Sequence, residues 1–207
     1  VYKIIVKDPD ERKVGGAFSN AGTEIGLCSI PGMFGTAGGP GPGQPFGVYW
    51  PTLLDSTLAP MDVVVGGKRT VIDNTPSESA PDIEPLKVAL PDLPQGVTRS
   101  VPLGTLFGTR SGDKGPNANL GVFARTPEAF VWLSDFLTID RLKSLMPEAA
   151  DRRIERFDLP NLWSLNFIFH GLLEEGVAAS TRQDPQAKAL GEYLRAKVVD
   201  IPEVLLL

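Results

Sequence analysis

The chain has 207 residues, of which 42% are hydrophobic and 22% are charged, the composition of an ordinary globular protein. Its net charge of −5 offers no basic surface for nucleic acid, and no apolar stretch is long enough to span a bilayer. One cysteine and one histidine exclude an internal disulfide framework and leave too few ligands for an all-protein zinc site.

These exclusions lead us to expect a cytoplasmic protein without a metal or a resident cofactor. The chain opens inside a strand-like run, Val1–Lys7, rather than at a methionine. We therefore expect a processed or truncated chain. The following stretch, Val14–Ser29, is rich in glycine and small residues and allows no firm assignment.

Glycine and proline dominate the next stretch. Residues 35–47 contain three prolines, which lack the N–H groups that a phosphate-binding loop must offer. A rigid surface or interface loop is therefore expected here. Tyr49 and Trp50 follow directly, and such an aromatic pair is typical of a core or a subunit interface.

A hairpin and a linker are expected next. Gly66-Gly67 lies between two β-branched runs, which predicts a hairpin of Asp62–Val65 and Lys68–Ile72. Five prolines within residues 74–99 then indicate an extended linker. We predict a β-rich region at 1–75, a linker at 76–99 and a separate domain at 100–200.

The predicted domain begins with a polar stretch between two apolar runs. We predict a strand at Leu103–Phe107, a glycine-punctuated loop at Gly108–Asn119 and a strand at Leu120–Ala124. A loop that joins two strands often carries side chains that bind a ligand. The whole stretch is therefore the main candidate for a functional site.

The rest of the domain alternates helices and strands. Thr126 and Thr138 are expected to cap two helices, with Pro127 at the first helical position. Strands are expected at Arg152–Phe157 and Leu162–His170, and a last helix is expected from Asp184 through Val198. This order predicts an α+β fold, a small antiparallel sheet covered by helices on one face.

Strand alternation places the only histidine away from the predicted core. Leu165, Phe167 and Phe169 should face the helices, and Asn166, Ile168 and His170 should face the other way. His170 is either a half-buried or interface histidine or a general acid or base, which its near-neutral reference pKa permits. Asn166 could then orient a carbonyl or an oxyanion.

Charged side chains in the polar stretch allow two interpretations. Arg110 and Lys114 can bind a carboxylate or a phosphate. In the other interpretation, Asp113 and Lys114 only compensate each other's charge in a solvent-exposed turn. Ser111 has no nucleophile elbow around it, and the spacing does not fit a Walker loop.

Three motifs resemble the C-terminal domain of the acyclic terpene utilisation (AtuA) family, whose fold is described as ferredoxin-like. Thr109 stands where that family has a smaller residue, and Ala187 stands where it has glycine. A weaker resemblance to the tail of the family's larger N-terminal domain covers residues 31–58. The motifs are TRSGDKGPNANLGV at 109–122, LPNLWSLNFIFHG at 159–171 and DPQAKALG at 184–191.

The resemblance implies the C-terminal part of a longer catabolic protein that acts on acyclic terpenoids at the acyl-CoA level. The first hypothesis is an enzyme fragment: a lyase, hydratase or hydrolase whose site is completed by the N-terminal region or by neighbouring subunits. His170 or Asp113 would move protons, and CoA would enter only as part of the substrate. The substrate-binding residues would be Arg110, Ser111, Lys114, Asn117, Asn119 and Asn166.

The second hypothesis is a non-catalytic assembly or ligand-binding domain of a homo-oligomer. In this interpretation Asp113 and the two asparagines of the polar stretch bond backbone amides and hold the structure together. The exposed sheet face and Tyr49-Trp50 would then bind another subunit. The sequence alone does not decide between the two hypotheses.

Overall fold

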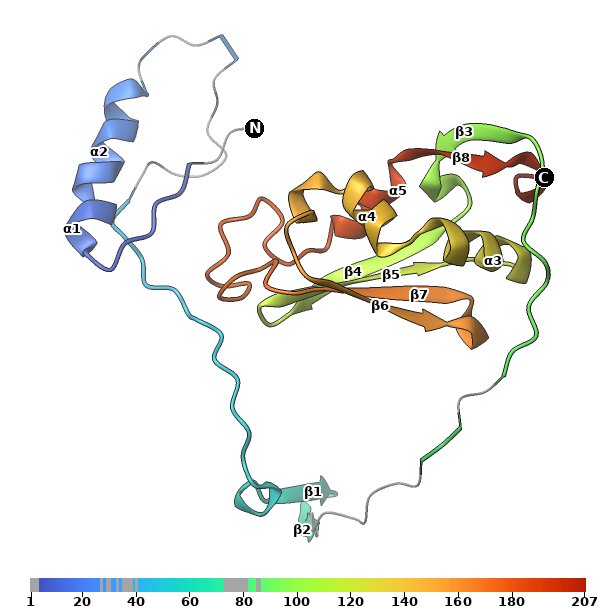
Figure 1. The fold of residues 1–207 in the computed structure, drawn as a ribbon. Coiled ribbons are helices and arrows are strands. Elements are labelled where there is room, and N and C mark those ends of the chain that lie inside the picture. Colours follow the sequence, from blue (N-terminus) through green and yellow to red (C-terminus); the bar gives the residue numbers. More distant parts are fainter. Residues whose placement is uncertain are drawn as a thin grey trace.

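A computed structural model describes residues 4–26, 28, 31–32, 34, 39, 41–72, 82–84 and 87–207. The C-terminal half contains a four-stranded antiparallel sheet with the strand order β4-β5-β7-β6. Helices lie on one face of this sheet, and its other face is not covered by any of them (Figure 1). The predicted α+β fold with helices on one face is therefore confirmed. The strands are β4 (Gly108–Lys114), β5 (Asn117–Phe123), β6 (Ile154–Leu159) and β7 (Ser164–Phe169).

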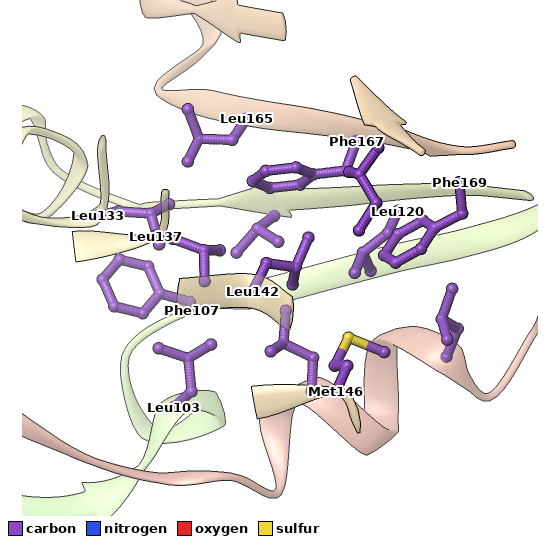
Figure 2. Packing of buried hydrophobic residues seen from close by; sticks show 14 of the residues in the cluster. Leu103, Phe107, Leu120, Leu133, Leu137, Leu142, Met146, Leu165, Phe167 and Phe169 are labelled. Carbon is purple, nitrogen blue, oxygen red and sulfur yellow. The ribbon is translucent and has the colours of Figure 1, made fainter. Parts of the chain in front are cut away.

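The core lies between the sheet and the helices. Alternate residues of β5 and β7 are buried: Ala118, Leu120 and Val122 on one strand, and Leu165, Phe167 and Phe169 on the other. Figure 2 shows side chains from the helices, among them Leu133 and Leu142, meeting those of the strands. Full burial of each such side chain stabilises the fold by about 1.5–3 kcal/mol relative to exposure.

Two helices begin where the sequence predicts. In α3 (Pro127–Phe136) the hydroxyl of Thr126 accepts a hydrogen bond of 3.2 Å from the amide of Ala129. In α4 (Ile139–Leu145) Thr138 accepts one of 3.1 Å from Arg141. These caps satisfy amide groups that the first helical turn leaves free, which confirms both predicted helix starts.

The last predicted helix is much shorter than expected. The carboxylate of Asp184 accepts hydrogen bonds from the amides of Lys188 and Ala189, but the segment 184–189 forms turns. The helix itself, α5, spans only Leu190–Arg195. Val198 begins a strand, β8 (Val198–Pro202), which pairs with β3 (Thr98–Pro102) in a second small sheet. Neither of these strands was predicted, and the buried Val199 and Ile201 anchor this sheet to the core.

The predicted loop at Gly108–Asn119 is wrong. Its residues form most of a hairpin of β4 and β5, and only Gly115 and Pro116 make the turn. Gly115 has a φ of 62°, which glycine adopts without strain. The predicted strand at Leu103–Phe107 is wrong as well, because Leu103–Thr105 forms a short 3-10 turn and Phe107 fills the core.

The first hundred residues match the predictions only in part. The hairpin is confirmed as β1 (Met61–Val65) and β2 (Lys68–Ile72). Residues 4–7 form no strand, and two helices follow instead, α1 (Glu11–Val14) and α2 (Gly16–Ile25). A core position for Tyr49 and Trp50 is wrong, because they are 53% and 90% exposed. Residues 76–81 and 85–86 of the predicted linker lie outside the described residues, and the linker boundaries stay predictions.

Candidate functional site

The four-stranded sheet separates the predicted site residues into two groups. Successive side chains of a strand point to opposite faces, and the pairing register shows which of them share a face. Ser111 and Asp113 pair with the buried Leu120 and Ala118, so they lie on the helix side. The other six lie on the face without helices, called the open face below: Arg110, Lys114, Asn117, Asn119, Asn166 and His170.

Gly121 lies at the centre of one cluster on the open face. It pairs with Arg110 on one side and with Asn166 on the other. Asn119 precedes it on the same face of β5. Its amide nitrogen Nδ2 donates a hydrogen bond of 3.3 Å to Asn166 Oδ1. The three polar side chains therefore surround a position at which the sheet carries no side chain.

Arg110 is the cation of this cluster. Its side chain is exposed, and among the residues that the structure describes it has no hydrogen-bond or ion-pair partner. The bond between the two asparagines leaves the Nδ2 group of Asn166 available as a donor. Arg110 and Asn166 can thus both donate hydrogen bonds to an anion placed over Gly121.

His170 lies at the other end of the open face, directly after β7. Its Nε2 is 3.2 Å from Oε2 of Glu155 on β6, without the alignment of a hydrogen bond. Glu155 also forms an ion pair with Arg153. The contact with His170 lowers the pKa of Glu155, desolvation opposes this shift, and the charge of Arg153 adds to it.

A pH dependence follows from the lowered pKa of Glu155. A carboxylate whose pKa is lower in the folded state stabilises the fold above its unfolded pKa of about 4.3. This contribution is lost as the pH falls through the folded value. Urea denaturation over a series of acidic pH values should therefore show a steeper loss of stability for the wild type than for Glu155→Gln. Parallel curves would contradict the prediction.

Two further polar residues of the open face bond the backbone. Asn117 accepts a hydrogen bond of 2.9 Å from the amide of Gly171, which ties the hairpin turn to the segment after β7. Lys114 Nζ donates one of 2.9 Å to the carbonyl of Asp113. Lys114 is exposed at the edge of the sheet, so its ammonium group can still exchange this contact for a ligand.

On the helix side, Ser111 bonds the start of α5. Its hydroxyl accepts a hydrogen bond of 2.9 Å from the amide of Gly191 and donates one of 3.1 Å to the carbonyl of Lys188. Gly191 lies so close to β4 that an added Cβ would be 2.6 Å from Oγ1 of Thr109. The serine hydroxyl thus supplies the cap that α5 lacks in its own sequence.

Asp113 lies near the hairpin turn, beside a cavity of about 300 Å³. Lys188 Nζ is 3.8 Å from its carboxylate. The cavity is also lined by Tyr49, whose amide donates a hydrogen bond of 2.9 Å to the carbonyl of Glu175. The ring of Tyr49 occupies the space over Gly115 where a side chain would lie. The sheet therefore keeps Asp113 apart from His170.

Gly121 and Glu155 belong to this face but were not predicted to do so. The strand alternation that placed His170 on this face would also have placed both of them there. Gly121 follows Asn119 by two residues, and Glu155 precedes Phe157 by two residues in a predicted strand. Once β5 and β6 are known to flank β7, these positions must share its open face.

Within the described part of the chain, no three histidine, cysteine, aspartate or glutamate side chains gather as a metal site would require. No helix there is long and apolar enough to cross a membrane.

Comparison with known proteins identifies one domain. Residues 101–200 match the model of the AtuA ferredoxin-like domain. This range covers all four strands of the sheet, the helices over it and part of the second small sheet. The chain matches no curated protein and no solved structure.

Proposed function

Residues 101–200 belong to the AtuA ferredoxin-like domain family, and from this premise we propose that the open face binds an anionic small molecule within an AtuA-type catabolic protein. The observation that carries the proposal is the cluster around Gly121. Arg110 supplies an exposed guanidinium group, Asn166 supplies an amide, and glycine leaves room between them. A guanidinium group binds carboxylate and phosphate oxygens in pairs, which favours such ligands over neutral ones.

The length of the open face indicates the size of the ligand. Asn166 and His170 lie four residues apart along the direction of β7, which corresponds to about 13 Å at roughly 3.3 Å per residue. A small carboxylate over Gly121 cannot reach His170. A longer molecule with an anionic end, such as an acyclic terpenoid carboxylate or an acyl-CoA, can extend along the face toward it.

His170 is the group that we assign to proton transfer. Glu155 Oε2 lies 3.2 Å from Nε2, so the imidazole ring faces a carboxylate on the neighbouring strand β6. A lyase, hydratase or hydrolase reaction on an acyl substrate requires such a group. The rest of the site would come from other parts of an AtuA-type protein or from neighbouring subunits.

The test measures binding to the full chain by NMR. Citronellate and acetyl-CoA serve as separate probes, and the amide resonances of Gly121 and Asn166 are expected to shift with at least one of them. Arg110→Ala should weaken this binding about tenfold, the effect of losing one charge-assisted contact of about 1.4 kcal/mol. Arg99→Ala is the matched control, because Arg99 is an exposed arginine of β3.

The proposal is wrong if neither probe moves the resonances of the open face. It is also wrong if Arg110→Ala and Arg99→Ala weaken binding equally, because the anion would then respond only to the total charge. Binding that survives Arg110→Ala but fails in Asn166→Ala would place the anion elsewhere on the same face.

A further inference from the structure

Strand β6 forms one edge of the four-stranded sheet, beyond β7. The amide of His170 donates a hydrogen bond of 3.0 Å to the carbonyl of Arg153, in register with the pairing of β6 and β7. Because bonding alternates along an antiparallel pair, the N–H and C=O groups of Ile154, Arg156 and Asp158 point away from β7. Within the described part of the chain these backbone groups have no hydrogen-bond partner.

An edge strand of this kind can pair with a further strand. Its six residues are a typical strand length, and they include neither the proline nor the lysine that often protects an edge. Two large apolar side chains on the open face of β6 are also exposed, Phe157 at 47% and Leu159 at 37%. A strand placed beside β6 would satisfy its backbone and cover part of both side chains.

We propose that two copies of this chain join their sheets edge to edge, with β6 of one copy antiparallel to β6 of the other around a two-fold axis at Phe157. The charge pattern of β6 argues for a second copy as the partner. With the axis at Phe157, Arg156 of each copy lies opposite Asp158 of the other, on the helix side. These are the residues whose backbone groups point outward, so each pair exchanges its N–H···O bonds. The two phenylalanine rings meet on the open face, and both kinds of cross-strand pair are favourable.

Charge also excludes the neighbouring registers. Strands of one continuous sheet pair residues of the same face, so the two-fold axis passes through a residue rather than between two. An axis at Glu155, Arg156 or Asp158 would place that charge opposite its own copy, which is destabilising. Arg156 also contacts Asp158 within its own chain. The axis at Phe157 therefore joins two such ion pairs into one cluster in which every charge faces an opposite one.

The edge contact leaves the open face of each copy uncovered. Gly121 lies on β5, and β7 separates this strand from the edge. Anion binding at Gly121 and the dimer are therefore independent, and the failure of one proposal does not affect the other. A contact along one strand is smaller than the roughly 1,200 Å² at which stable interfaces begin, so we expect a weak dimer with a Kd of about 100 μM.

The test uses the residue that meets its own copy at the axis. Sedimentation equilibrium of the full chain, without ligand, should show a dimer whose fraction rises with concentration. Phe157→Asp and Phe157→Lys should each weaken it about tenfold or more, because each places two like charges opposite each other. An equimolar mixture of the two variants should associate again, since aspartate then faces lysine. Phe157 is half exposed, so both variants are expected to fold, and circular dichroism checks this.

Phe123→Asp is the matched control. Phe123 lies on the same open face with a similar exposure of 42%, but on β5, away from the edge, so this variant should dimerise like the wild type. A wild-type chain that stays monomeric up to about 500 μM, well above the expected Kd, overturns the proposal. Equal weakening by Phe123→Asp overturns it as well, because the contact would then involve the open face. Failure of the mixed Phe157 variants to associate also overturns it, because residue 157 would then not lie on the axis.

Discussion

Replacing Phe167 with alanine is expected to lower the free energy of unfolding by about 3–5 kcal/mol. Phe167 is fully buried on β7, which lies between β5 and β6 in the sheet. Its ring lies among side chains from both layers (Figure 2). Removing the ring loses the transfer free energy of its atoms and leaves a cavity that rigid strands cannot close. Urea denaturation followed by circular dichroism measures the change.

Ile168→Ala is the matched control for this prediction. Ile168 is the next residue of the same strand, but it points to the open face and is only half-buried. Its truncation should cost about 1 kcal/mol, since less apolar surface returns to water. Equal losses for the two variants would contradict the assignment of the faces, on which the binding proposal depends.

The second large effect is expected from Ser111→Ala, which should cost about 1–3 kcal/mol of folding stability. The variant leaves the buried amide of Gly191 without its acceptor, 80 residues away in the sequence. Hydrogen exchange should show faster exchange for the first amides of α5 than in the wild type. Ser164→Ala is the control, because Ser164 of β7 donates an exposed hydrogen bond to the carbonyl of Leu162.

Ser111 also distinguishes a binding role from a structural one. If Ser111→Ala leaves the stability and the hydrogen exchange of α5 unchanged but weakens ligand binding, the Ser111 hydroxyl binds the ligand and does not stabilise the start of α5. If stability falls and binding at Gly121 persists, the helix side of β4 serves the fold. The two faces of one strand would then have different roles.

The sequence by itself determined the elements whose signals are local. Thr126 and Thr138 mark helix starts because an N-cap side chain bonds only to the first turn of the helix that follows it. The faces of β7 follow from an alternation within six residues. The Gly66-Gly67 turn defines the β1–β2 hairpin in the same way. These features need no distant partner, which is why they were predicted correctly.

Only the tertiary structure decided the features that depend on distant pairs. The polar residues of β4 form a strand because β5 supplies its hydrogen bonds on one side and α5 packs close to it. β3 and β8 exist because they pair with each other across about a hundred residues. The same long-range pairing register places Arg110, Gly121 and Asn166 side by side on the open face. It places Ser111 on the face that the helices cover. Strand pairing is non-local, so a polar stretch with three glycines resembles a loop until its partners are known.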